Sequence, residues 1–179
     1  MRLFCLFLSF FSVFIWPVCS QAAGSIGVVD VAYILSKSQA AQNIQAQRQS
    51  VREAFLADIS KTEQALRAEE KKILDQRGKI SQEDYLKLRQ VYEANLLELR
   101  KDAQQKKRAL EEASNVAMNV LREELYVVVQ EIANERGFEL VISNKNVIAG
   151  EKSLDITKET LEIINKNLKE VPLKIEEVE

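Results

Sequence analysis

The chain has 179 residues, a formal net charge of −2 and no histidine, and its two cysteines, Cys5 and Cys19, lie in an apolar N-terminal stretch. The remaining chain therefore lacks both thiol and imidazole, which excludes a Ser/His/Asp triad, a cysteine nucleophile and the usual zinc or copper sites. No Asp-x-Asp-x-Asp calcium loop or glycine-rich phosphate loop occurs either. We expect a protein that is not an enzyme and uses no metal or cofactor.

Residues 1–22 have the composition of a cleavable signal peptide. Arg2 is the only charge, and an apolar run ends in Ser20-Gln21-Ala22, which supplies the small residues that signal peptidase recognises. An uncleaved membrane helix is the alternative, although the run of about 16 residues is shorter than the ~20 that span a bilayer. A lipoprotein anchored at Cys19 is a weaker alternative. The leader predicts a secreted protein.

The first segment after the leader predicts a buried strand followed by a helix. Residues 26–31, Ile-Gly-Val-Val-Asp-Val, form a β-branched apolar run. Residues 32–35 are typical of a helical turn, and the main helix can begin at Ser38. This serine is an imperfect cap, because Ala41 rather than an acidic residue stands three positions later.

Residues 39–112 predict a helical hairpin that projects as an arm. Residues 39–76 are rich in strong helix formers and contain neither glycine nor proline. Gly78 stands where a left-handed residue ends a helix, and Ser81, with an acid three residues later, begins the next helix. The tip of the arm is therefore expected near residues 77–81.

Both helices of the arm carry apolar residues at the spacing of a coiled-coil seam. The outward helix has one stripe: Ile44, Val51, Phe55, Ile59, Leu66, Ile73 and Ile80. The return helix has a seven-residue series and a second series offset by four: Tyr85, Tyr92, Leu99, Lys106, Ala113, Val120 and Val127, then Leu96, Ala103, Leu110 and Ala117. Lys106 and the alanines weaken this seam, so we expect an arm that flexes.

The chain after Gly137 predicts the rest of a small β body. Residues 138–142 predict a strand, residues 146–149 its hairpin partner, and residues 155–157 the start of a final amphipathic helix. Three short strands and one short helix bury too little surface to stand alone, so we expect the sheets of several chains to associate. A dimer through the long helices is the alternative. The expected intersubunit core consists of apolar strand residues: Val29, Val31, Phe138, Leu140 and Ile142.

The predicted fold class is α+β, with the arm projecting from a discontinuous body of residues 23–38 and 113–179. Charge is divided unevenly between these parts. Residues 39–112 hold 15 basic and 13 acidic side chains, whereas residues 113–179 hold 8 and 13. The arm is therefore slightly positive and the body clearly negative.

Two sets of arm residues are candidates for holding another chain. The basic set is Arg100, Lys101, Lys106, Lys107 and Arg108. The apolar set is Leu56, Leu74, Leu86, Leu88 and Leu97. A solvated helix face is the alternative for the first set, and a wider seam for the second. The functional interpretation is attraction of an acidic client or transient contact with an anionic membrane surface, whereas the leader and the acidic balance argue against nucleic acid.

Three segments together resemble the Skp/OmpH family of periplasmic chaperones. They are Gly-Val-Val-Asp-Val at 27–31, the run from Ile132 to Ile142 that contains Gly-Phe-Glu-Leu-Val-Ile, and Asp-Ile-Thr at 155–157. With the leader and the long hairpin, the resemblance covers essentially the whole chain after the leader. The arm itself is generic coiled-coil sequence and contributes little to the resemblance.

The resemblance implies a periplasmic homotrimer with a β-barrel body and three helical arms that enclose a cavity. It also implies an ATP-independent holdase that keeps unfolded outer-membrane β-barrel proteins soluble. This chain departs from the family in its charge. The best-known members are strongly basic, whereas the chain from Ala23 has 24 basic and 27 acidic residues. The competing interpretation is a scaffolding coiled coil of the cell envelope, for which long charged helices would look the same.

Overall fold

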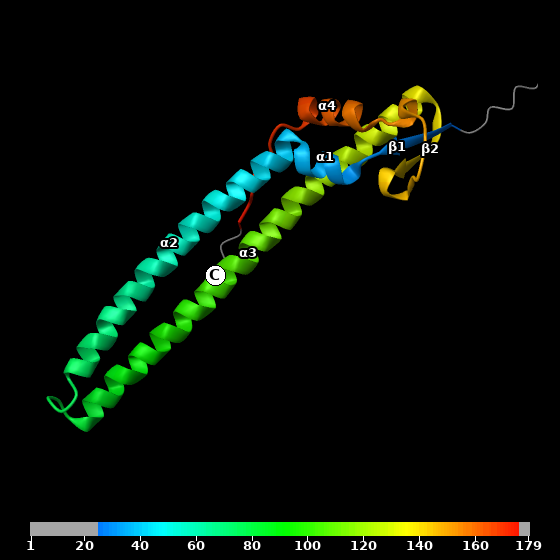
Figure 1. Ribbon diagram of the computed structural model, residues 1–179. Helices are drawn as coiled ribbons and strands as arrows, with labels where there is room; N and C mark the ends of the chain where they lie inside the picture. Colours follow the sequence, from blue (N-terminus) through cyan, green and yellow to red (C-terminus); the bar gives the residue numbers. More distant parts are fainter. Residues whose placement is uncertain (1–24, 176–179) are drawn as a thin grey trace, which may run out of the picture.

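The computed structural model describes residues 25–175, in which a long two-helix arm extends from a small body (Figure 1). The predicted leader, residues 1–22, lies outside the described residues. The elements follow in chain order: β1 (Ser25–Val29), α1 (Val31–Lys37), α2 (Gln39–Asp75), α3 (Gln82–Arg136), β2 (Phe138–Ser143), the 3-10 turns η1 (Asn144–Asn146) and η2 (Lys152–Leu154), and α4 (Thr157–Asn167).

The ends of the arm helices follow the local signals in the sequence. The fully buried Ser38 caps α2, because its hydroxyl accepts a hydrogen bond from the Ala41 N–H (3.3 Å). At the tip, Gly78 has a φ of 78°, a conformation that strains residues with a side chain. The Ser81 hydroxyl accepts from the Asp84 N–H (3.1 Å) and starts α3. Residues 76–81 thus connect α2 to α3.

The two arm helices differ in length, and the extra length of α3 lies in the body. At 1.5 Å per residue, the 37 residues of α2 extend about 55 Å and the 55 residues of α3 about 80 Å. The C-terminal part of α3 therefore continues beyond the start of α2 and becomes the central helix of the body (Figure 1).

The heptad pattern predicted for α3 ends near the body. Tyr92, Leu99 and Ala113 are buried as predicted, but Val120 and Val127 are 41% and 53% exposed. Beyond residue 110, the buried positions recur every eleven residues: Leu110, Leu121 and Ile132, then Ser114 and Leu125, then Ala117 and Val128. An eleven-residue repeat corresponds to about 3.67 residues per turn, which is closer to the about 3.6 of a straight helix than is the about 3.5 of a seven-residue repeat. In this stretch α3 packs against several elements of the body, the first turns of α2 among them, and not against α2 alone.

The sheet has two parallel strands and not the predicted hairpin. β1 pairs with β2, and Val28 also forms a parallel bridge with Asp155. Residues 146–149 form no strand, and Ile148 is fully exposed. Two contacts account for this difference. The Ile156 N–H donates to the Val28 carbonyl (2.9 Å), and the Ser143 hydroxyl accepts from the Lys145 N–H (3.4 Å), which turns the chain into η1.

The core of the body joins all of its elements. Val29 of β1 and Ile34 of α1 meet the first turns of α2, the C-terminal half of α3 and both ends of α4. The buried members are Val29, Ile34, Ala40, Ala41, Ile44, Ala117, Leu121, Leu125, Val128, Ile132, Ile156, Ile164 and Val171. The long helices thus supply most of the apolar surface that three short strands would lack.

Asp30 connects three segments that are distant in sequence. Its carboxylate accepts from the Tyr33 N–H (2.8 Å) at the start of α1 and from the Asn144 amide (2.6 Å). Its own N–H donates to the Thr157 hydroxyl (2.8 Å) at the start of α4. The Gly-Val-Val-Asp-Val and Asp-Ile-Thr segments therefore meet through direct hydrogen bonds, which explains why both carry polar residues beside apolar strands.

Candidate functional site

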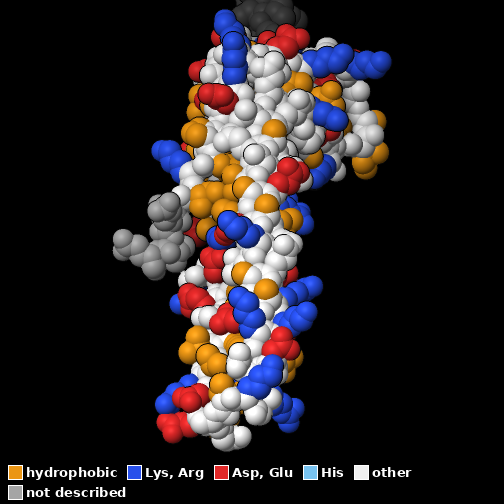
Figure 2. Space-filling view, turned by 90° about the vertical axis from the view of Figure 1, so that its left-hand side faces the viewer, with side chains coloured by type: hydrophobic (Ala, Val, Ile, Leu, Met, Phe, Trp, Pro, Cys, Tyr) orange, Lys and Arg blue, Asp and Glu red, His pale blue; other side chains and the backbone are white. Residues whose placement is uncertain are grey.

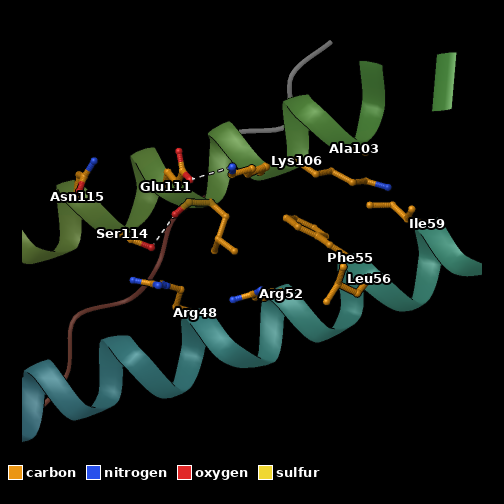
Figure 3. A pocket seen from close by; sticks show the side chains of 12 residues that line it. Arg48, Arg52, Phe55, Leu56, Ile59, Ala103, Lys106, Glu111, Ser114 and Asn115 are labelled. Carbon is orange, nitrogen blue, oxygen red and sulfur yellow. Dashed lines mark hydrogen bonds and ion pairs between the residues drawn. The ribbon is translucent and has the colours of Figure 1, made fainter. Parts of the chain in front are cut away.

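The arm opens between its two contact regions into a groove of about 820 Å³ (Figure 3). Toward the tip, α2 and α3 are held together by the buried cluster of Leu66, Ile73, Tyr92 and Leu99. Toward the base they are held by the core of the body. Between these regions the facing side chains leave space. The residues that line the groove are Arg48, Arg52, Phe55, Leu56, Ile59, Ala103, Lys106, Lys107, Leu110, Glu111, Ser114 and Asn115.

Lys106 crosses the seam beside the groove. Its ammonium lies 2.5 Å from the Asp58 carboxylate on α2 and 2.9 Å from Asp102 one turn away on α3. It also lies 5.8 Å from the centre of the Phe55 ring, within cation–π range. The hydrogen bond from Lys106 lowers the pKa of Asp58, and the hydrogen bonds to Asp58 and Asp102 raise the pKa of Lys106. The positive charge of Lys106 at this seam position is thus balanced by the two neighbouring carboxylates.

The other cations of the groove come from both helices. Arg48 and Arg52 extend from α2 into the space facing α3 (Figure 3). Within residues 25–175, neither arginine has a carboxylate within ion-pair distance. Lys107 approaches Glu111 on its own helix only to 3.9 Å. The groove therefore combines an apolar floor around Phe55 with positive charge.

The structure divides the predicted basic set. Lys106 and Lys107 line the groove, whereas Arg100, Lys101 and Arg108 are exposed on α3 outside it. Sequence reasoning missed Arg48 and Arg52. Their spacing of four residues, followed by Phe55 and Leu56, was the available signal, but their approach to α3 depends on how the two helices pair.

The five candidate leucines of the arm are exposed and do not widen the seam. Their exposed fractions range from 40% at Leu88 to 68% at Leu97. Leu56 borders the groove, and Leu86 lies beside a second shallow hollow near the tip. Figure 2 shows hydrophobic side chains in separate groups along the arm, with charged side chains between them. On the face that Figure 2 shows, the arm therefore offers several small apolar patches.

The predicted intersubunit residues fall into two groups. Val29 is buried in the core of its own chain, and Val31 and Phe138 pack against that core. Leu140 is 53% exposed, and Ile142 is half-buried. The prediction that Phe138, Leu140 and Ile142 share one strand face is wrong for Phe138, which points to the core on the opposite face.

A β-bulge is the physical reason for that error. Ser25 pairs with Phe138 and Ile26 with Leu140, so Glu139 is an extra residue that breaks the alternation. Phe138 and Val141 consequently point to the same core. A Cβ on Gly27 would lie 3.0 Å from the Phe138 ring, so any larger residue at that position would have to push the ring aside by a few tenths of an ångström.

An exposed apolar row on the body was missed by sequence reasoning. Val116, Val120 and Val127 recur on one face of α3 and are all exposed. Two of them had been assigned to the arm seam. With Leu140 and Ile26, they give the body apolar surface that its own core does not cover.

The segment after α4 returns along α2 toward the groove (Figure 1). The amide of Gln47 holds it on both sides, donating to the Val171 carbonyl (2.8 Å) and accepting from the Leu173 N–H (3.0 Å). Val171 is buried, and Leu173 packs against the core. The segment is therefore fixed one residue before Arg48, at the base of the groove.

Residues 25–175 contain neither a candidate metal site nor a candidate membrane-spanning helix. No group of three or more His, Cys, Asp or Glu side chains between residues 25 and 175 could hold a metal ion. No helix in that range is long and apolar enough to cross a membrane. The grooved arm and the apolar row on the body are the candidate functional surfaces.

Comparisons with known proteins agree with this architecture. A family model described as outer membrane protein (OmpH-like) matches residues 25–164. A crystal structure of an outer membrane chaperone described as OmpH-like, from Caulobacter crescentus CB15, superposes with a TM-score of 0.81 at 15% identity. The match covers 88% of this chain and 93% of that chain. No curated protein sequence matches significantly. At such low identity the structural likeness shows the shared fold.

Proposed function

The chain belongs to the OmpH-like family, since the family model covers most of it, and on this premise we propose that it is a periplasmic holdase chaperone. In this role it binds unfolded outer-membrane β-barrel proteins and keeps them soluble without ATP. The observation that carries the proposal is the arm, where exposed leucines and a basic, partly apolar groove line a long surface.

The chemistry of the arm suits a mobile client. An unfolded chain presents scattered apolar side chains and free backbone groups, so a holdase gains most from many weak contacts. Each exposed leucine can bury part of its side chain, at roughly 25 cal/mol per Å² of apolar area. Several such contacts retain a client, and the loss of any one contact has little effect.

Association of three chains through the body is the second part of the proposal. The exposed valines of α3 and Leu140 supply an apolar surface, and a two-stranded sheet leaves strand edges that a neighbouring chain can pair with. Three arms around one space would surround a client from several sides. The mass of the protein in solution tests this proposal, because a dimer through the arms would contradict it.

An aggregation assay tests the holdase role. An unfolded outer-membrane β-barrel protein is diluted from urea without nucleotide, and light scattering is followed at increasing protein concentration. A holdase suppresses the scattering, whereas a scaffolding coiled coil leaves it unchanged.

Replacing leucines locates the holding surface in the same assay. The five arm leucines, Leu56, Leu74, Leu86, Leu88 and Leu97, are changed to serine singly and together. We expect small single effects and a large combined loss. Ile148→Ser is the matched control, because Ile148 is fully exposed on the body and lies outside the arm.

A further inference from the structure

The groove in the arm is lined on α2 by a row of four side chains. Arg48, Arg52, Phe55 and Ile59 follow one another at intervals of four, three and four residues, so they share one face of the helix. The two arginines lie toward the base of the arm and the two apolar residues toward its tip (Figure 3). The row is therefore basic at one end and apolar at the other.

The facing side of the groove, on α3, adds a second apolar residue at the level of Phe55. Lys106 reaches Asp58 across the seam, which fixes the register of the two helices. About one turn closer to the base on each helix lie Leu110 and Phe55, so these residues stand at the same level of the groove. Leu110 is buried and Phe55 is half-buried. The floor of the groove is apolar at this level.

The two arginines carry the positive charge of the groove that is not already balanced among residues 25–175. In that range neither Arg48 nor Arg52 has a carboxylate within ion-pair distance. By contrast, Lys106 is held by two carboxylates, and the Lys107 ammonium lies 3.9 Å from the Glu111 carboxylate. The groove thus selects for negative charge at the level of the two arginines.

The spacing of the arginines matches an extended peptide. Four residues of an α-helix rise about 6 Å, and alternate residues of an extended chain lie about 6.6 Å apart and point to the same face. A chain lying along α2 can therefore direct two carboxylates, two positions apart, at Arg48 and Arg52. The residue after the second carboxylate lies about 10 Å from the first and points to the other face. It is then level with Phe55, which stands about 10.5 Å along the helix from Arg48.

The same alternation is a general property of the client class proposed above. Strands of membrane β-barrels alternate apolar residues, which face lipid, with polar residues, which face the interior. An extended strand with two acidic residues on its polar face presents apolar residues between and beside them. Such a strand can place its carboxylates against the arginines and its apolar residues on the floor of the groove.

We propose that the groove is a binding site for an extended segment in which two acidic residues, two positions apart, alternate with large apolar residues. Arg48 and Arg52 bind the two carboxylates, and the apolar residue after them packs against Phe55 and Leu110. The assignment of this segment to an unfolded β-barrel strand rests on the proposed holdase function, whereas binding of the peptide itself does not.

A synthetic peptide tests the site without any client protein. The peptide Gly-Ser-Asp-Val-Glu-Phe-Ser-Gly, amidated at its C-terminus and labelled with a fluorophore, is titrated with the protein and followed by fluorescence anisotropy. The control Gly-Ser-Asp-Glu-Val-Phe-Ser-Gly has the same composition without the alternation, and we expect it to bind at least about threefold more weakly. Equal affinity for the two peptides would overturn the alternating pattern.

Substitution of the arginines locates the site. Arg48→Gln with Arg52→Gln should weaken binding of the alternating peptide about threefold to tenfold, as expected for the loss of two exposed ion pairs. Arg67→Gln with Lys71→Gln is the matched control, because these residues have the same spacing on α2, are exposed and lie outside the groove. An equal loss in both double variants would reduce the effect to net charge and overturn the site.

An exchange of charges tests direct contact. Arg48→Glu with Arg52→Glu should lose the acidic peptide and bind a peptide in which both acidic residues are replaced by lysine. Wild type should not bind the lysine peptide. A charge-exchanged variant that binds neither peptide would overturn direct pairing at these positions.

Two further outcomes separate this inference from the holdase function and from another occupant. Aggregation suppression that persists without any peptide binding would overturn the inference and leave the holdase function standing. Peptide binding without aggregation suppression would support the groove and contradict the holdase proposal. Anionic phospholipid vesicles that bind through Arg48 and Arg52, with no binding of the peptide, would assign the groove to a membrane surface and overturn the peptide site.

Discussion

The base and the arm of this molecule use the same helices for opposite purposes. At the base, α3 presents Leu121, Leu125 and Val128 to a core in which all three are buried. In the arm, the same helix faces α2 through residues such as Ala103 and Lys106 and leaves a groove. One helix thus changes from a closely packed core element to an adaptable surface along its length. The packing that stabilises the fold is therefore concentrated at the base, whereas the surface that can bind another chain lies in the arm.

Deleting most of the arm should have the largest effect on this contrast. Removing residues 60–100 and reclosing the helices with a short glycine-containing turn leaves the whole core of the body in place. We expect the circular dichroism of a folded protein and unchanged oligomer mass, with loss of aggregation suppression. A truncated protein that still protects an unfolded β-barrel client would show that the arm is not the holding surface.

Leu140→Asp should separate folding from association. Leu140 is half exposed in the single chain, so the protomer tolerates a charge there, but an intersubunit core would have to bury it. We expect native mass spectrometry to show monomer while circular dichroism stays unchanged. Leu97→Asp on the arm is the control and should leave the oligomer intact. An intact oligomer in Leu140→Asp would remove this residue from the interface.

A pair of matched leucine substitutions measures the difference in packing directly. Leu121→Ala empties a fully buried site and should cost about 2–5 kcal/mol in the free energy of unfolding. Leu97→Ala removes the same atoms from an exposed site and should change it by less than ~0.5 kcal/mol. Urea unfolding checks both variants. Similar losses would mean that the arm is packed as tightly as the base.

Salt should have only a moderate effect on client binding. The arm carries 15 basic and 13 acidic residues, and exposed charges are screened beyond about 8 Å at physiological ionic strength. We expect the affinity to fall by less than roughly tenfold between about 50 and about 300 mM salt. A titration that shows a hundredfold loss would assign the dominant role to the basic residues from Arg100 to Arg108.

The smallest expected effect concerns pH and the pair across the seam. Because the pKa of Asp58 is lowered below its ordinary 3.8, the stabilisation by this pair is fully present above that value and disappears as the pH falls through the lowered pKa. The raised pKa of Lys106 keeps the lysine charged throughout that range. The urea midpoints of wild type and Asp58→Asn should differ by a constant amount from pH 5 to 8 and converge in acid. A difference that changes within that interval would point to another titrating group.

Local sequence patterns predicted much of the arm. The strand pairing in the body depends on contacts between distant residues, which these patterns do not reveal. The Ser81 cap, the Gly78 turn and the buried Tyr92 and Leu99 all follow from residues within two turns of one another. The hairpin at 146–149 did not form, because Ser143 turns the chain into η1 directly after β2 and Asp155 then pairs with Val28 of β1.

The candidate surfaces were predictable only in part, for the same reason. The leucines of the arm were found because their positions fall off the apolar stripe of a single helix. Arg48 and Arg52 were missed because only the pairing of α2 with α3 makes them neighbours of Lys107. The bulge at Glu139 was equally invisible, since it depends on the register of β2 against β1.

We expect the hydrogen bonds of Asp30 to form late in folding. Its partners Asn144 and Thr157 follow it by 114 and 127 positions, whereas the arm helices need mainly local contacts. Contacts between distant residues form slowly, because a long stretch of chain must be ordered to close them. A chain that emerges N-terminus first can build its arm early but cannot pair β1 until nearly all of it is present. Until then β1 is an unpaired apolar strand, the same hazard that the proposed clients present.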